Sequence, residues 1–184
     1  MTRRRLQVMM ILALAAAAGV WIFHRWRREA SALSAVVRAD AFRVYEGLPH
    51  PLFEQELLKS ERRSKKTVEL EGFPFYAPPL APDDAVVESL RRRISGLRLR
   101  DRPMGLKKCG GFHPDSALEW DVGADQYLLL LCLRCSEAKL YGPGFEVYRD
   151  LDATDAAAFS ELLAACRRRP PDARRRTEPP APSP

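Results

Sequence analysis

The sequence predicts an α+β protein in which an N-terminal transmembrane helix precedes a small domain, an antiparallel sheet packed by about three helices. Two observations predict the domain: its second half contains two hairpin signals, and a helix start lies on either side of that half. A third predicts the anchor, because residues 6–23 carry no charge and Gln7 is their one polar residue. An apolar run of about 18–20 residues is long enough to cross a bilayer as a helix.

The flanks of this run bear on its orientation. Three arginines precede it and three follow it within five residues, so the positive-inside rule favours an extracytoplasmic body by a narrow margin. Trp21 and Trp26 stand where interfacial anchors occur. Two other interpretations stay open. Ala13-Leu14-Ala15 fits a signal-peptide cleavage pattern, and the run could also form a buried or interfacial helix.

The chain divides by composition into five segments around a single domain. The last segment is rich in Pro and Arg without apolar periodicity, which predicts disorder. The segments are a basic N-terminus (1–5), the transmembrane anchor (6–23), a juxtamembrane helix or linker (24–39), the α+β domain (40–168) and the disordered tail (169–184).

The net charge of +6 is unevenly distributed. Residues 1–39 hold seven Arg and one Glu, and residues 166–184 hold six Arg and two acids. The middle, 40–165, has 17 basic and 21 acidic residues. A nucleic-acid-binding domain would carry a basic patch on its folded part, so no nucleic-acid partner is expected. The basic termini favour anionic lipid headgroups instead.

The first half of the domain predicts mixed elements. A helix is expected over 30–45, a break at Glu46–Pro51, and a second helix over 52–61. Alternation at 67–71 predicts a strand, and 73–79 is aromatic and extended. Pro82-Asp83-Asp84 predicts the start of a helix that ends near Ile94, with Gly96 as its cap.

The second half predicts strands. Two apolar runs, 117–122 and 126–133, flank a Gly-containing turn, and a second pair, 137–141 and 145–148, flanks Gly142-Pro143-Gly144. The run 127–132 lacks a polar face, which predicts a central strand buried on both sides. Asp152 is expected to cap a last helix.

Several motifs recur in a fixed order along the domain: YEGLPHP (45–51), GFPFY (72–76), CGGFHPD (109–115), Cys132 with Cys135, and KLYGP (139–143). Together they resemble an uncharacterised family of bacterial membrane-anchored or exported proteins, over about residues 40–165. The resemblance implies a shared domain and no particular activity. Ser136 follows the second cysteine of the C-x-x-C, so the c-type haem motif C-x-x-C-H is absent.

Cys109, His113, Cys132 and Cys135 form the candidate site, and its chemistry has several interpretations. A Cys3His set suits tetrahedral zinc, and C-x-x-C is the usual knuckle spacing. In an oxidising compartment a disulfide would join Cys109 to Cys132 or Cys135. A catalytic C-x-x-C normally precedes a long helix, for which residues 136–141 are too short. The residues could also be simply small and buried.

Several other polar and aromatic residues are candidate functional groups. His113, Asp115 and Glu119 could do acid–base chemistry, although a capped turn at Asp115 explains them more simply. His50, between two prolines, suits a rigid turn. Candidate pocket residues, for which core packing is the alternative, are Phe73, Phe75 and Tyr76. Cys166 is expected to be a free thiol.

These observations predict a single-pass, membrane-anchored domain that binds or scaffolds, with a possible protein partner and a structural Cys/His clasp that is a disulfide or zinc. The alternative is an enzyme, a thiol–disulfide oxidoreductase or a zinc-dependent enzyme. An enzyme would need an exposed reactive Cys132 or an open metal position, whereas Cys132 ends the most apolar strand.

Overall fold

The computed structural model describes residues 3–101 and 111–167, and the statements below concern these residues. Along the chain it contains, in order, α1 (Arg3–Ala35), η1 (Val36–Arg38), β1 (Ala41–Glu46), α2 (Gln55–Ser64), β2 (Thr67–Leu70), β3 (Phe73–Tyr76), α3 (Asp84–Ser95), β4 (Ser116–Val122), β5 (Asp125–Cys132), β6 (Glu137–Gly142), β7 (Phe145–Asp150) and α4 (Ala153–Ala164). The α+β class predicted from the sequence is confirmed.

The main sheet has five antiparallel strands in the order β1-β4-β5-β6-β7, and β2 and β3 form a separate hairpin. Strands β4 to β7 follow one another as hairpins, whereas β1 pairs with β4 from the far side. Strand β5 is therefore the central strand, with two strands on each side of it. Leu129, Leu130 and Leu131 are fully buried, as expected for a strand covered on both faces.

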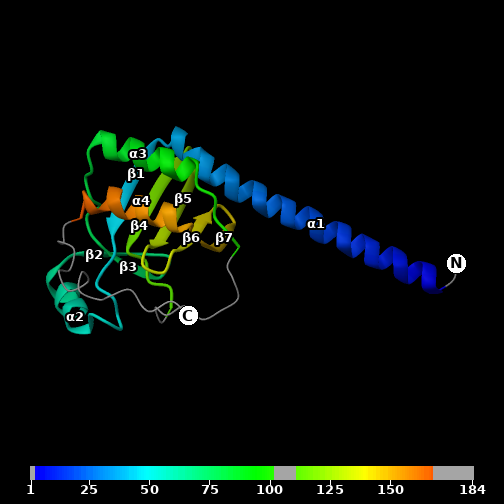
Figure 1. The fold of residues 1–184 in the computed structure, drawn as a ribbon, viewed down its shortest axis with the longest axis horizontal. Coiled ribbons are helices and arrows are strands. Elements are labelled where there is room, and N and C mark those ends of the chain that lie inside the picture. The colour runs from blue at the N-terminus through cyan, green and yellow to red at the C-terminus, as the bar shows by residue number, and fades with distance from the viewer. Residues whose placement is uncertain (1–2, 102–110, 168–184) are drawn as a thin grey trace.

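The two faces of the sheet are covered by different elements (Figure 1). Helices α3 and α4, together with η1 and the end of α1, lie over one face, where Trp120 and Phe159 belong to the main core. The β2–β3 hairpin covers part of the opposite face and packs Phe75 against Ala117 and Leu130. We call the first surface the helix face and the second the hairpin face.

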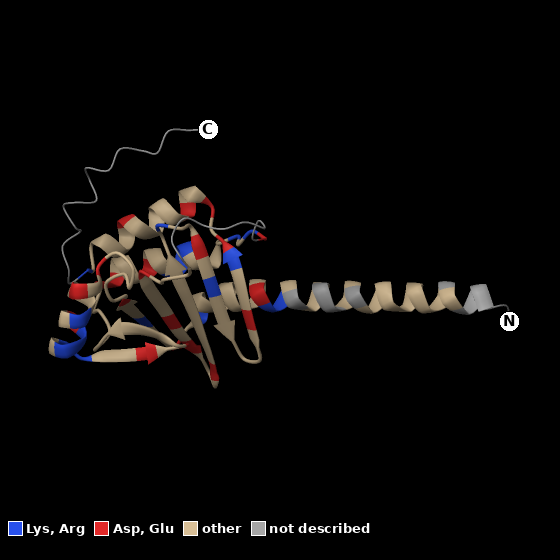
Figure 2. Ribbon diagram, turned by 90° about the horizontal axis from the view of Figure 1, so that it is seen from below, with Lys and Arg blue, Asp and Glu red and all other residues tan. Residues whose placement is uncertain are grey.

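Helix α1 is anchored in the domain only by its C-terminal turns. Ala32, Leu33 and the following Val36 are buried in the main core. The rest of the helix projects from the domain (Figures 1 and 2). Many of its apolar side chains are exposed. Among the described residues, no helix combines the length and the apolar character that crossing a membrane requires, so the structure does not support the transmembrane span predicted over residues 6–23.

The prediction of a helix over residues 30–45 is wrong in its second half. The helix stops at Ala35, η1 follows, and Ala41–Glu46 is the edge strand β1. Val44 is buried in the main core on the helix face, whereas Arg43 and Tyr45 lie on the hairpin face. That alternation has the period of a strand, and pairing with β4 outweighs the weak helical pattern.

The other strands and helices predicted for the domain are confirmed with shifts of a few residues. The Asp83 side chain accepts a hydrogen bond from the Val86 backbone N–H and caps α3, and Gly96 is its C-cap. The Asp152 side chain accepts from the Thr154 N–H and caps α4. Helix α2 begins at Gln55 rather than at residue 52. The predicted tail, 169–184, lies outside the described residues.

Candidate functional site

The C-x-x-C motif spans the tight turn between β5 and β6. Cys132 is the last residue of β5, and its register partner Glu137 is the first residue of β6. Ser136 adopts a left-handed backbone conformation with φ of 51°, and its N–H donates to the Leu133 carbonyl at 3.4 Å. The reversal of the chain brings both sulfurs and the Glu137 carboxylate to one end of the sheet.

The cysteines differ in their chemical state. Cys132 is a buried free thiol and Cys166 a partly buried one, whereas Cys135 is disulfide-bonded. The free thiol of Cys132 does not agree with the predicted pairing of Cys109 with Cys132. Cys109 lies outside the described residues, so its pairing with Cys135 stays a prediction. Cys166 agrees with the expectation of a free thiol; its Sγ lies 3.6 Å from the Leu162 carbonyl.

The environment of Cys132 keeps it a thiol at neutral pH. Burial is the largest effect and raises the pKa of its Sγ to about 11, against opposing hydrogen bonds from the backbone of His113 and Cys135. The carboxylates of Asp115 and Glu137 raise the pKa further. A redox-active thiol needs the opposite, a lowered pKa and exposure to its substrate.

A group of potential metal ligands lies at this turn. The sulfurs of Cys132 and Cys135 and a carboxylate oxygen of Glu137 lie within 4.8 Å of one another, and all three residues are buried. Sequence reasoning missed Glu137. The sequence did contain a signal for Glu137. In a tight hairpin turn, the residue two positions after the second cysteine lies opposite the first cysteine on the neighbouring strand.

His113 and His50 lie beside this group. Their ring centroids are 4.6 Å apart, and the His50 Nδ1 accepts a hydrogen bond from the Leu52 N–H at 3.1 Å, as a turn residue would. Burial, followed by the nearby His50, lowers the pKa of His113. His113 contacts Cys132 through its backbone, and within the described residues its ring does not belong to the ligand group.

Two sequence motifs meet behind the cysteine turn. The Gly47 N–H donates to the Asp115 carbonyl at 2.9 Å, and a Cβ at Gly47 would lie 2.2 Å from the Pro114 carbonyl oxygen. A residue larger than glycine would therefore push the two segments apart. The Asp115 carboxylate accepts from the Leu133 N–H at 2.7 Å. Asp115 thus holds the turn that carries Cys135.

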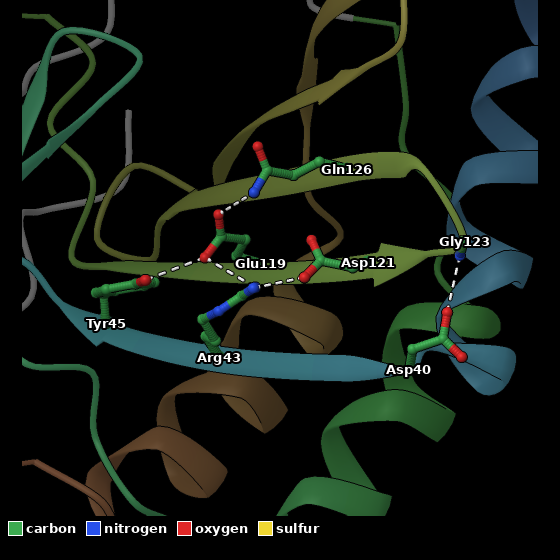
Figure 3. Close-up of polar contacts among 7 residues, drawn as sticks. All are labelled: Asp40, Arg43, Tyr45, Glu119, Asp121, Gly123 and Gln126. Atoms are coloured by element: carbon green, nitrogen blue, oxygen red, sulfur yellow. Dashed lines mark hydrogen bonds and ion pairs between the residues drawn. The ribbon is translucent and has the colours of Figure 1, made fainter.

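A second polar cluster lies on the hairpin face at the β1 edge (Figure 3). The Glu119 carboxylate accepts from the Tyr45 hydroxyl at 3.0 Å and from the Gln126 amide at 2.7 Å. It also pairs with Arg43 at 3.3 Å, and Arg43 bonds to Asp121 as well. Burial and the Glu119 charge raise the pKa of Tyr45 to about 12. We call these five residues the Glu119 network.

The structure does not assemble His113, Asp115 and Glu119 into an acid–base group. Asp115 holds the cysteine turn, and Glu119 is saturated by the partners of its own network. Each of these side chains has a structural contact that accounts for it. The Asp115 carboxylate thus binds the turn after β5 and not the local turn after Pro114 that the sequence predicted.

Four aromatic rings surround the ammonium group of Lys139. Its Nζ lies 5.4 to 6.0 Å from their centroids and 3.1 Å from the Glu146 carboxylate. The rings are those of Phe73, Phe112, Tyr141 and Tyr148. This aromatic box joins the β2–β3 hairpin to the sheet. Of the predicted pocket residues, Phe75 and Tyr76 are buried instead.

Comparisons of the chain with protein-family models, with curated proteins and with solved structures gave no match. The family resemblance carried by the motifs therefore stays a prediction, and so does any function inferred from it.

Proposed function

We propose that this chain is a membrane-attached binding or scaffold domain whose cysteines form a structural clasp. Residues 6–23 provide the attachment, and the domain lies on the extracytoplasmic side. The observation that carries the proposal is the set of exposed apolar side chains on the part of α1 that projects from the domain.

The apolar segment of α1 has the character of a surface that contacts lipid. Met9 to Leu12, Leu14, Val20 and Phe23 are between 57% and 65% exposed. Large apolar patches on a soluble surface indicate a contact with another molecule or with lipid. Trp26 and the nearby arginines follow where the headgroup region would begin.

The state of the cysteines supports a clasp rather than a catalytic pair. Cys135 is already in a disulfide, and Cys132 is buried with a raised thiol pKa. Disulfides persist in oxidising compartments, which agrees with an exported domain. We propose Cys109 as the partner of Cys135, since Cys132 and Cys166 are both free and the chain has four cysteines.

The attachment is tested by expressing the full chain in bacteria and extracting the membrane fraction with alkaline carbonate. We expect the chain to remain in the membrane pellet. The double variant Leu12→Asp, Leu14→Asp should move to the soluble fraction, because each charge costs about 3 kcal/mol at the centre of a bilayer. Val37→Asp is the matched control, since Val37 is 59% exposed but lies on the domain. A wild-type chain found in the carbonate supernatant would refute membrane insertion.

The side of the membrane is tested separately. A protease added to intact spheroplasts should digest the domain, and protection equal to that of a cytoplasmic marker would show the opposite orientation. Alkylation of the unfolded protein without reductant should modify Cys132 and Cys166 and leave the other two cysteines blocked.

A further inference from the structure

Cys132, Cys135 and Glu137 are arranged as the ligands of a metal ion would be, although Cys135 is engaged in a disulfide. The three ligand atoms come from one hairpin turn, lie within 4.8 Å of one another and are all buried. Two thiolates bound to a tetrahedral zinc lie about 3.8 Å apart, given Zn–S bonds of about 2.3 Å. The two sulfurs would therefore need to approach each other by about 1 Å at most to reach zinc geometry.

We propose that Cys132, Cys135 and Glu137 bind a thiophilic divalent cation such as Zn²⁺ when the disulfide of Cys135 is reduced. The site is then redox-gated, because the sulfur of Cys135 either joins a disulfide or serves as a thiolate ligand. The inference depends on the residues of the turn alone, and it holds whether or not the membrane attachment proposed above is correct.

The turn is held in place before any metal arrives. Ser136 is fixed in its left-handed conformation, and its carbonyl accepts from the Leu151 N–H at 2.8 Å. The Asp115 carboxylate binds the Leu133 N–H on the other side of the turn. Such contacts around ligating residues orient them and strengthen metal binding.

The local charge also favours a cation. Glu137 is 1% exposed, and its register partner across β6 and β7 is the buried Asp150. Asp115 and Glu137 are close enough to Cys132 to act on it electrostatically. The negative charges of these carboxylates attract a divalent cation.

Reduction of the disulfide precedes metal binding. A phosphine reductant and water convert the disulfide into two thiols and the phosphine oxide, with two electrons passing from phosphorus to sulfur. The divalent ion then displaces the protons of Cys132 and Cys135, and Glu137 binds as the carboxylate. The complex carries one net negative charge, and two protons go to solvent.

The test is a titration of the full-length chain with Co²⁺ under anaerobic conditions, with and without phosphine. We expect the reduced chain to develop thiolate-to-cobalt charge-transfer absorption that an equivalent of Zn²⁺ abolishes, and the oxidised chain to develop none. Absence of this absorption in the reduced chain would overturn the proposal.

Variants identify the ligands. Glu137→Gln should weaken Zn²⁺ binding more than about 10-fold, since even changes outside the ligand set cost about 10- to 100-fold. Glu161→Gln, on the exposed side of α4, is the matched control, and Cys166→Ser is the thiol control. Unchanged affinity in Glu137→Gln, or lost binding in a reduced Cys109→Ser chain, would each contradict a site made of these three residues.

A second measurement covers the case in which Glu137→Gln fails to fold. In the reduced wild-type chain, Zn²⁺ should protect Cys132 and Cys135 from alkylation while Cys166 continues to react. Equal reactivity of Cys132 and Cys135 with and without Zn²⁺ would overturn the proposal, whatever the result of the carbonate extraction.

Discussion

The cysteine turn and the Glu119 network lie on the same face of the sheet and hold it by different means. In the first, Cys132 and Cys135, three positions apart, meet at a hairpin turn, and Cys135 is also linked by a disulfide to a cysteine other than Cys132. In the second, Arg43 and Glu119 come from strands 76 positions apart and meet through ion pairs and hydrogen bonds. A reductant acts on the first cluster through the disulfide of Cys135, whereas the second is held by charge and hydrogen bonds.

The largest effect is expected from the disulfide. Cys135→Ser should lower the free energy of unfolding by about 3 kcal/mol, because a disulfide restricts the unfolded chain. Thermal unfolding of the non-reduced protein measures the loss. Cys166→Ser, which removes a free thiol, should leave the midpoint nearly unchanged. If both variants unfold at the same temperature as the wild type, the cysteine turn does not depend on its covalent link.

The next effect is expected at the centre of the Glu119 network. Glu119→Ala should cost about 2 kcal/mol, because hydrogen bonds to charged groups contribute about 1.5–3 kcal/mol and Arg43 and Tyr45 lose a shared partner. Urea denaturation measures it. Glu146→Ala, whose carboxylate is half exposed in its pair with Lys139, is the control and should cost less. An equal cost in the two variants would show that burial of the network does not matter.

A smaller effect is expected at the aromatic box. Lys139→Met keeps the aliphatic stem and removes the charge that faces the four rings. A cation–π contact contributes about 0.5–2 kcal/mol depending on its exposure, so a loss of about 1 kcal/mol is expected. A double-mutant cycle of Lys139→Met with Tyr148→Leu measures the coupling energy between the two side chains. Additive losses of stability in the double variant would contradict an interaction between them.

The smallest effect is a pH dependence that separates the two clusters. The pKa of Tyr45 rises from 10.0 to about 12 in the fold, so the folded state retains this proton more strongly. Its contribution is complete below pH 10 and is lost as the pH rises through 12. Tyr45→Phe should flatten this part of the stability curve, and Cys132→Ala should instead flatten the part between the ordinary pKa of 9.0 and about 11. If the free energy of unfolding of Tyr45→Phe changes with alkaline pH as it does in the wild type, Tyr45 is not the source of this pH dependence.

The sequence alone predicts those parts of the site that are formed by residues close together in the chain. The hairpin turn at 133–136, the buried β5 and the capped helices α3 and α4 follow from local patterns, and so does the closeness of Cys132 and Cys135. The contact of Gly47 with Pro114 and the partners of Glu119 involve segments far apart in the chain. Their pairing follows from the position of β1, for which the sequence predicted a helix.

Local sequence patterns suffice for the α+β class, for the strand order along the chain from β4 to β7, and for the apolar segment before the domain. These features depend on side-chain periodicity, turn residues and caps, which act over a few residues. Packing in three dimensions is needed to make 41–46 a strand, to bring Glu137 to the two sulfurs, and to enclose Lys139 by four rings. Each of these requires a register between strands, and register is set by packing of the whole sheet.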